Sequence, residues 1–381
     1  MARDHAAQPA LDMAGSDSSC SASDDLSAYR ADPRIAERLA RVRSAYAGLV
    51  RRRWIVLAIL AVLIVASVTL DFSLGPARLT PLQLARTLLN PGAVPLPQHV
   101  IVWQIRLPYA LMAVLVGLAL GISGGEMQTI LDNPLASPFT LGVSAAAAFG
   151  ASLAIVLNWR LPFVPQEWIV SADAFGFAIA SAVMLELVAR LRGSSTATVV
   201  LFGIALVFTF HALVSLVQFV ADEDSLQDLV FWTMGSLTRA DWPKVGVLAC
   251  ASLVITPLSL RAAPALTALR LGEDRAASFG VDVRRARIAS LLRISVLASL
   301  AVSFVGTIGF VGLIAPHIAR RLVGEDHRYY LPAAALVGGL VMSLSSIAAK
   351  NIVPNVVVPV GIVTALVGIP FFLAIVLRVR S

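Results

Sequence analysis

Residues 264–287 read Pro264-Ala-Leu-Thr-Ala-Leu-Arg-Leu-Gly-Glu-Asp-Arg-Ala-Ala-Ser-Phe-Gly-Val-Asp-Val-Arg-Arg-Ala-Arg287, a polar, arginine-rich stretch between two long apolar segments. A loop that only joins two membrane helices needs a handful of residues. This stretch instead has the spacing of one or two short amphipathic helices, broken at Gly272 and Gly280. We therefore expect a docking surface for a soluble partner on one face of a membrane domain; a solvated interfacial loop is the alternative.

The composition sets the class of protein. Of 381 residues, 58% are hydrophobic and only 14% are charged, which is too apolar for a soluble domain of this size. The net charge of +7 does not indicate nucleic-acid binding, because the arginines gather beside apolar stretches as the positive-inside rule describes. Cys20 and Cys250 stand alone, so neither a disulfide framework nor a CxxC metal site is expected. The expected fold class is an all-α, polytopic membrane protein.

The first fifty residues form a polar tail. They are rich in Asp, Ser, Ala and Arg, have no apolar core, and are too long and polar for a signal peptide. We expect residues 1–50 to be a disordered cytoplasmic tail with a nascent helix around Asp32 to Ala47, and assign it no function. The transmembrane domain is expected to occupy residues 51–381.

Apolar stretches of about 20 residues can cross roughly 30 Å of hydrocarbon. Ten helices are expected on this rule, near residues 54–72, 109–130, 139–158, 169–190, 198–221, 244–261, 286–305, 309–322, 329–350 and 357–377. The eighth is short, contains Pro316 and follows a run of glycines, so we expect it to be packed inside the protein. A short interfacial helix is also expected from Pro81 to Leu89.

Arginine placement predicts the orientation. Three consecutive arginines, residues 51–53, precede the first expected span and place the N-terminus in the cytoplasm. The basic clusters at 190–192, 264–287 and 320–328 then lie inside, whereas the acidic residues between 222 and 241 lie outside. An even number of spans also places the C-terminus in the cytoplasm.

Catalytic motifs are absent from the sequence. The only lysines, Lys244 and Lys350, are followed by Val and Asn, so no Gly-Lys-Ser/Thr phosphate-binding loop exists. Neither GxSxG nor HExxH occurs. We expect a transport subunit without an ATPase site of its own, not an enzyme.

Several motifs occur in a specific order. They are Trp103-Gln-Ile-Arg-Leu-Pro108, Gly117-Leu-Ala-Leu-Gly-Ile-Ser-Gly-Gly125, Asn133-Pro-Leu-Ala-Ser-Pro-Phe-Thr-Leu-Gly-Val-Ser144, Leu271-Gly-Glu with Phe279-Gly-Val, Gly309-Phe-Val-Gly-Leu-Ile-Ala-Pro-His-Ile-Ala-Arg320 and Pro359-Val-Gly-Ile-Val-Thr-Ala-Leu-Val-Gly-Ile-Pro-Phe-Phe372. In this order and spacing, the sequence from about residue 55 to 378 resembles the permease family of bacterial ABC importers for iron-siderophores, haem and vitamin B12.

The resemblance implies a ten-helix subunit of the bacterial inner membrane that pairs with itself or a paralogue, with the translocation path along the dimer axis. Its implied partners are two cytoplasmic ATPase subunits, a periplasmic or lipoprotein substrate-binding protein, the second permease subunit and membrane lipid. It implies no cofactor and no nucleic acid.

The resemblance also implies roles for the polar stretch at about 264–283, which is similar to the family's coupling helices. We expect its apolar side chains to sit in a groove of the ATPase while its charged side chains support them. The residues expected to take part are Leu266, Leu269, Arg270, Leu271, Gly272, Glu273, Arg275 and Gly280.

Two cations and one inner loop match further family positions. Arg106 and Lys350 resemble docking positions for the binding protein, although Arg106 is equally consistent with an interfacial anchor that snorkels to lipid headgroups. The family often has an arginine where this chain has Tyr109, and an acidic residue where it has Val357-Val358. Ser194, Ser195 and Thr196 resemble the cytoplasmic gate; a polar turn with a hydroxyl N-cap is the alternative.

Three ionisable residues lie within expected spans. His211 is a candidate for the path, but a lone histidine is more often a neutral hydrogen-bond partner between helices. Glu126 is expected to be a packing or inner-gate contact. His317 is expected to brace the region beside the coupling segment, and no second His or Cys is spaced to form a metal site with it.

The predicted function is that of a permease subunit which imports ferric siderophore by alternating access. The cargo prediction rests on segments such as Phe231-Trp-Thr-Met-Gly-Ser236 and on siderophore systems being the commonest members of the family. Haem and vitamin B12 remain alternatives. A second class is a proton-coupled secondary transporter that uses Glu126 and His211 as a relay. An intramembrane enzyme ranks last, because no paired catalytic constellation is present.

Overall fold

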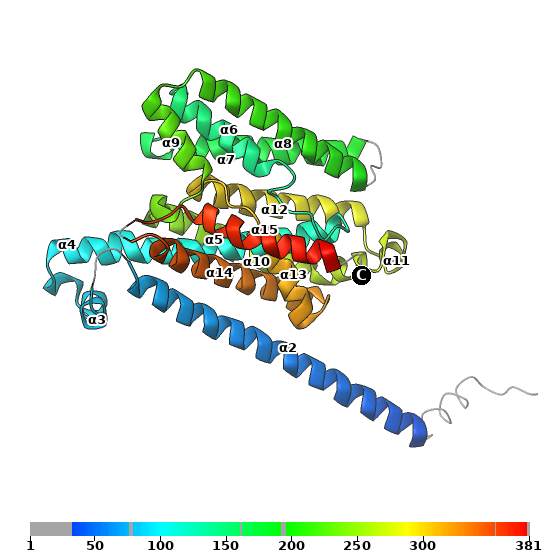
Figure 1. Ribbon diagram of the computed structural model, residues 1–381. Helices are drawn as coiled ribbons and strands as arrows, with labels where there is room; N and C mark the ends of the chain where they lie inside the picture. The colour runs from blue at the N-terminus through cyan, green and yellow to red at the C-terminus, as the bar shows by residue number, and fades with distance from the viewer. Residues whose placement is uncertain (1–32, 76–78, 161, 192–195, 355, 379–381) are drawn as a thin grey trace, which may run out of the picture. The chain divides into compact units, whose positions relative to one another are not determined.

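The computed structural model describes residues 33–75, 79–160, 162–191, 196–354 and 356–378. Within these ranges every regular element is a helix, apart from an isolated bridge between Val353 and Val356. Contacts divide the chain into two units, Met1–Arg52 and Arg53–Ser381, and all the elements described below lie in the second unit except for the helical residues 33–52. The predicted all-α class is therefore confirmed (Figure 1).

Each of the ten predicted ranges contains a helix whose ends lie within a few residues of the expected ones, except for the extensions of α2 and α10. These helices are α2 (Pro33–Ser73), α5 (Leu107–Ile130), α6 (Val143–Val156), α7 (Ile169–Leu191), α8 (Thr196–Phe219), α10 (Trp242–Leu269), α12 (Val283–Val305), α13 (Val311–Val323), α14 (His327–Asn351) and α15 (Val360–Arg378). By length and composition, seven helical stretches of the described chain could cross a membrane, and two shorter apolar helices accompany them. The chain is thus a multi-pass membrane protein, while ten crossings remain a prediction.

Short elements connect these helices. They are α3 (Pro81–Leu89), η1 (Pro91–Ala93), α4 (Leu96–His99), η2 (Val100–Arg106), η3 (Gln166–Trp168), α9 (Glu223–Thr233), η4 (Leu237–Arg239) and α11 (Glu273–Ser278). The helix expected from Pro81 to Leu89 is α3, and it begins with a capping box in which Thr80 and Gln83 satisfy each other's backbone amides.

The helix expected near the N-terminus is part of α2. Residues 1–32 lie outside the described residues, and α2 begins at Pro33 and continues without a break to Ser73, a length of 41 residues. The nascent helix expected around Asp32 to Ala47 is therefore continuous with the first apolar helix. Its Ala, Leu and Arg residues favour helix once the adjoining apolar span supplies a nucleus.

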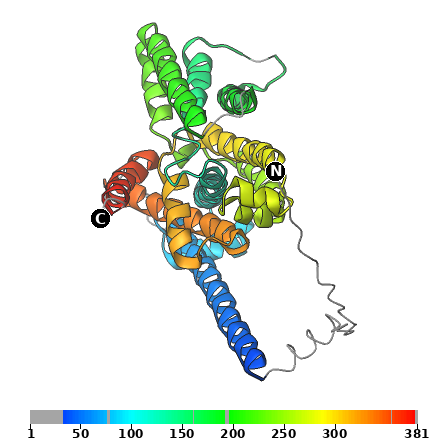
Figure 2. The same ribbon diagram turned by 90° about the vertical axis from the view of Figure 1, so that its right-hand side faces the viewer.

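Helix α5 is the most enclosed helix of the second unit. Figure 2 shows it nearly end-on, between α10, α12 and α14. Gly117 and Gly121 of α5 lie against Gly338 and Ala334 of α14, so closely that a Cβ on either glycine would overlap a backbone carbonyl. Small residues four apart allow the two backbones to pack this closely. Between helices in lipid such close packing drives association, because the hydrophobic effect does not.

Two non-helical segments meet beside α13. The loop after α5 brings Phe139 against Phe310, with ring centroids 6.4 Å apart. Phe310 has a φ of +65°, a strained conformation for a bulky residue that costs about 1–3 kcal/mol. Eight of the thirteen residues of α13 are buried, as expected for a short helix packed inside the protein.

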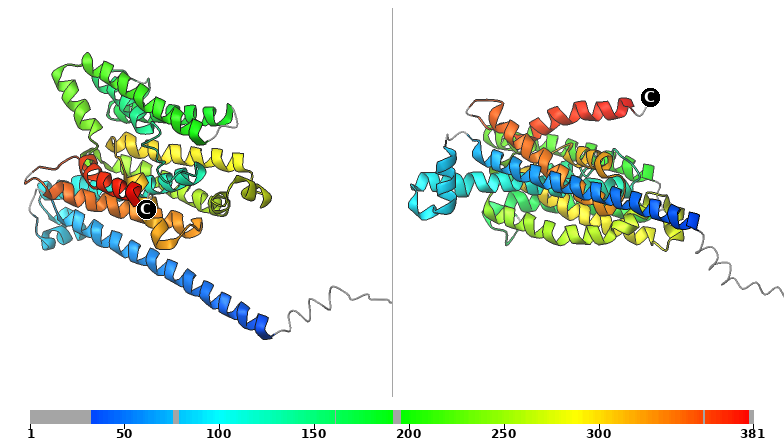
Figure 3. Two further views of the ribbon diagram at one scale, coloured as in Figure 1. Left: turned by 45° about the vertical axis from the view of Figure 1, so that its right-hand side comes forward. Right: turned by 90° about the horizontal axis from the view of Figure 1, so that it is seen from below.

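The helices of the second unit have two distinct ends. Helix α11 and the last residues of α15 lie at one end, which we call the basic end; α3, α4 and α9 lie at the other, which we call the acidic end (Figures 1 and 3). Helix α5 begins at the acidic end and finishes at the basic end, so it connects the two over about 36 Å.

Candidate functional site

The polar stretch that joins α10 to α12 forms the basic end. The backbone breaks where expected, because Gly272 and Gly280 have φ values of +104° and +81°, a region that glycine enters at low cost. Helix α11 lies between these glycines. Residues Pro264 to Leu269 do not form a separate short helix, as one interpretation of the sequence allowed, but are the last turns of α10.

The burial of the leucines corrects the predicted docking face. Leu266 and Leu269 are buried in a core cluster with Ile130 and Leu291, so they cannot fit into a partner's groove. The α10 helix continues past Pro264 and keeps its apolar face turned inward, which the sequence pattern did not indicate.

The exposed apolar side chains lie next to the two glycines. Leu271 is 51% exposed and Phe279 is 68% exposed, while Ala276 between them is fully buried and holds α11 against the protein. Leu271, Glu273, Arg275 and Phe279 together form what we call the coupling surface. Phe279 belonged to a recognised motif but was not among the predicted site residues. Its position beside a helix-ending glycine was the available signal.

Arg270 holds the start of the coupling surface in place. Its guanidinium donates to Asp132 Oδ1 at 2.6 Å and to Glu325 Oε1 at 3.0 Å. Asp132 lies in the turn after α5, and Glu325 lies in the turn between α13 and α14. The hydrogen bond from Arg270 holds the pKa of Glu325 below its usual value. The Glu325 carboxylate therefore stays charged at neutral pH, and it is protonated only as the pH falls through that lowered pKa.

Arg287, at the start of α12, makes a second connection. Its Nε donates to the carbonyl of Ile130, the last residue of α5, at 3.2 Å, and a terminal nitrogen donates to Glu273 Oε1 at 2.5 Å. Glu273 is the first residue of α11, so Arg287 joins the start of α11 to the last residue of α5.

A buried histidine lies directly behind these ion pairs. His327 at the start of α14 contacts Thr129 Oγ1 through Nε2 at 2.8 Å and Thr267 Oγ1 through Nδ1 at 3.2 Å. It therefore joins α5, α10 and α14 at one point. Sequence reasoning missed His327, because neither threonine is close to it along the chain.

Glu126 forms a buried ion pair. Its two oxygens accept from Nε and a terminal nitrogen of Arg293 on α12, the shortest contact being 2.7 Å, and the same arginine donates to Ser290 Oγ. The Glu126 side chain is fully buried. These contacts agree with the packing role that the sequence favoured for Glu126, and they connect α5 to α12.

Removing one partner of this pair is expected to destabilise the protein strongly, because the other charge is left buried. Glu126→Ala should lower the free energy of unfolding by about 3–5 kcal/mol, whereas the double variant Glu126→Leu, Arg293→Met should recover most of that loss. Thermal unfolding in detergent, followed by size-exclusion chromatography, measures both. A Glu126→Gln variant of unchanged stability that had lost transport would instead indicate proton transfer at this residue.

The two predicted docking cations lie at the acidic end, and both are buried. Arg106 donates to the carbonyls of Phe72 and Ser73 at 3.1 and 3.0 Å. Lys350 Nζ lies 2.9 Å from both the carbonyl and the carboxylate of Asp71, and 4.3 Å above the ring of Tyr109. Both charges are thus engaged within the chain, where they fix the end of α2 to α5 and α14. This geometry does not present either charge to a docked protein.

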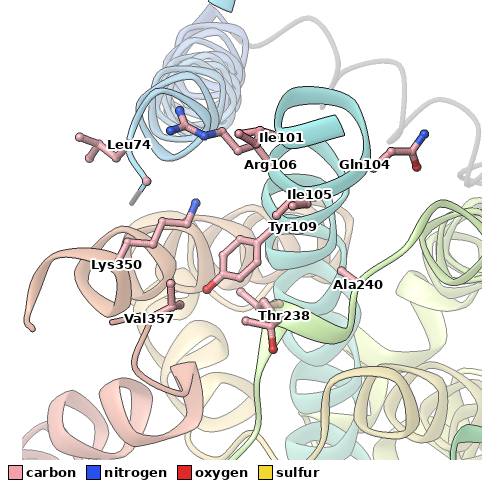
Figure 4. Close-up of a pocket in the computed structure, with 12 residues that line it drawn as sticks. Leu74, Ile101, Gln104, Ile105, Arg106, Tyr109, Thr238, Ala240, Lys350 and Val357 are labelled. Carbon is pink, nitrogen blue, oxygen red and sulfur yellow. The ribbon is translucent and has the colours of Figure 1, made fainter. Parts of the chain in front are cut away.

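A mainly apolar cavity of about 290 Å³ adjoins these cations (Figure 4). Leu74, Ile101, Ile105 and Val357 contribute to its lining, together with the ring of Tyr109. Tyr109 places an aromatic face under Lys350, which favours the cation electrostatically.

The remaining predicted site residues are dispersed. Ser194 and Ser195 lie outside the described residues, and Thr196 is the first residue of α8, whose side chain is not described. His211 is exposed on α8. His317 on α13 is partly buried, with its ring edge-on to Phe371 at 5.8 Å. Among the described residues, no group of three His, Cys, Asp or Glu side chains could hold a metal ion.

The fold and site define a class: a multi-pass helical membrane protein with an anchored, partly apolar surface at its basic end. The chain belongs to the FecCD transport family, whose model matches residues 59–378. It is similar to the Hemin transport system permease protein HmuU of Yersinia pestis, at 37% identity over 81% of this chain and 92% of that protein.

Two further similarities agree. The Fe(3+)-citrate import system permease protein YfmE of Bacillus subtilis is 33% identical over 85% of this chain and 95% of its own length. A solved structure of an inward-facing metal-chelate type ABC transporter has a TM-score of 0.73 and 30% identity, covering 86% of this chain and 99% of that one. The chain is therefore the permease subunit of an ABC importer, a class without its own ATPase site.

Proposed function

We propose that this permease imports a ferric siderophore, with haem and vitamin B12 as the alternative cargoes. Support for an iron chelate comes from the relative named as an Fe(3+)-citrate permease and from the similar structure titled as a metal-chelate type transporter. The haem permease of Yersinia pestis supports the first alternative.

The observation that carries the proposed mechanism is the coupling surface. Leu271 and Phe279 are exposed at the basic end, yet the helix between them is held by buried Ala276 and by ion pairs. Two exposed apolar side chains beside a firmly held helix suit a partner that binds by burying those side chains and then displaces the helix. We assign that partner as a cytoplasmic ATPase, because the positive-inside rule predicts that this arginine-rich end faces the cytoplasm.

The rest of the assembly follows from this orientation. The acidic end faces outward and receives the substrate-binding protein, and a second permease subunit covers the exposed face of α8 that carries His211. The residues around Ser194, Ser195 and Thr196 act as the inner gate. ATP-driven closure of the ATPase pair moves the coupling surface and switches the gate by alternating access.

The test is uptake by proteoliposomes that contain this chain, its ATPase and its binding protein, with iron-55 bound to a hydroxamate siderophore. We expect uptake that requires ATP and all three proteins. Binding-protein-stimulated ATP hydrolysis without iron uptake would retain the importer and transfer the cargo assignment to haem or vitamin B12. Uptake driven by a pH gradient through this chain alone would establish the proton-coupled transporter; the engagement of Glu126 with Arg293 argues against it.

A further inference from the structure

We propose that Arg270 and Arg287 are positioning residues that fasten the coupling surface to the basic end of α5, so that α5 carries its movement to the cavity at the acidic end. The proposal rests on the proposed function, in which an ATPase binds the coupling surface. It assigns the transmission path within the subunit to α5 and to the turn at Asp132.

Arg270 joins the coupling surface to two other parts of the protein. This residue directly precedes exposed Leu271, and its two hydrogen-bonded carboxylates belong to different parts of the protein. Asp132 is 79% exposed and Glu325 is 49% exposed in their side chains. Exposed ion pairs contribute only about 0–1 kcal/mol each to stability. These bonds are therefore weak contributors to folding, although they determine where the coupling surface sits.

The backbone of the turn after α5 directs the Asp132 side chain. Asp132 has a φ of +41°, so the chain leaves α5 in a left-handed conformation that an aspartate or asparagine tolerates better than most residues. The turn directs its carboxylate to Arg270, while the preceding carbonyl of Ile130 accepts from Arg287. Arg287 also holds Glu273, the first residue of α11. The first residues of the coupling surface are thus held at the end of α5, through Arg270 before Leu271 and through Arg287 at Glu273.

Helix α5 is packed so that it can transmit a displacement. Its middle packs backbone against backbone on α14 through Gly117 and Gly121, and its last turns are tied to α12 by the buried pair of Glu126 and Arg293. Such an element moves as a rigid body with little room to deform. At its other end, Tyr109 and the preceding residues Gln104 to Arg106 line the 290 Å³ cavity. A push at Arg270 therefore reaches the cavity wall along one continuous helix.

The experiment separates the two carboxylates that Arg270 holds. Asp132→Asn keeps a residue suited to the left-handed turn and removes only the charged bond to α5, whereas Glu325→Gln removes only the bond to the turn between α13 and α14. Arg270→Lys keeps the charge, and Arg270→Ala removes both bonds. Arg285→Ala is the matched control, because Arg285 is an exposed arginine of the same segment that pairs with nearby Asp282.

The first readout is the number of ATP molecules hydrolysed per cargo molecule taken up by the complete importer in proteoliposomes. Arg270→Ala and Asp132→Asn are expected to raise this ratio by about fivefold or more, the usual scale of a coupling free energy. Assembly with the ATPase and the thermal unfolding temperature should stay close to wild type. Arg270→Lys, Glu325→Gln and Arg285→Ala should raise the ratio less. An unchanged ratio in Asp132→Asn, or lost assembly in that variant, would overturn the proposal.

The second readout needs no cargo, so it separates this proposal from the cargo assignment. With Cys20 and Cys250 replaced by serine, a cysteine introduced as Gln104→Cys reports the accessibility of the cavity wall to a thiol reagent. In the complete importer, ATP with vanadate should change the labelling rate when Asp132 is present, and should not change it in Asp132→Asn. Equal responses with and without the Asp132 carboxylate would exclude α5 as the path, whatever the cargo proves to be.

Discussion

Replacement of both Leu271 and Phe279 by aspartate is expected to abolish binding of the ATPase while the permease stays folded in detergent. Each side chain is at least half exposed in the subunit, so its loss does not open the core. Burying an apolar side chain of this size contributes about 1.5–3 kcal/mol, so the double variant should bind at least about 100-fold more weakly. Co-purification and a titration of labelled ATPase measure the change.

Two controls make this result specific. The variant Leu271→Met, Phe279→Leu keeps both side chains apolar and should keep the ATPase bound. Leu269→Asp places a charge in the core cluster beside Ile130 and should prevent folding instead of weakening docking. Retained ATPase binding by the double aspartate variant would show that the coupling surface is not the docking site.

Alanine at both Gly117 and Gly121 is expected to destabilise the protein strongly. Each new Cβ would overlap a backbone carbonyl of α14, at Gly338 or Ala334, so α5 and α14 would have to separate. Overpacking costs about 1–3 kcal/mol at each site, and the sum is a large fraction of the free energy of unfolding of a typical protein, about 5–15 kcal/mol. The yield of monodisperse protein and its unfolding temperature should both fall sharply.

Gly176 offers the matched control. It lies within α7, another apolar helix, but nothing lies within 4 Å of the position its Cβ would take. Gly176→Ala should leave stability unchanged or raise it slightly, because alanine favours helix by about 1 kcal/mol over glycine. If Gly117 and Gly121 tolerated alanine as well as Gly176 does, the close contact of α5 and α14 would be wrong.

The coupling surface was predictable from the sequence only in part. The breaks at Gly272 and Gly280 were predictable, because glycine between charged and apolar turns is a local signal. The inward direction of Leu266 and Leu269 was not, since it depends on α10 continuing to its end against α5 and α12. For the same reason, the partners of Arg270 could not be predicted: Asp132 and Glu325 are 138 and 55 residues away in sequence.

The contacts of the two cations at the acidic end were not predictable from the sequence either. The family resemblance implies that Arg106 and Lys350 are docking charges, and a cation at the end of an apolar span normally reaches for water or headgroups. In the folded chain, the last two carbonyls of α2 and the carboxylate of Asp71 come within hydrogen-bond distance and engage both charges.

The sequence by itself determined that this is a multi-pass helical membrane protein, placed its helices to within a few residues except for the start of α2 and the end of α10, and identified its family motifs. Those properties depend on local composition, because a membrane requires long apolar helices whatever their neighbours are. The tertiary structure alone decided which leucines are buried, which ion pairs hold the coupling surface and which glycines bring α5 against α14. Those contacts join residues distant in the chain, and only packing in three dimensions selects them.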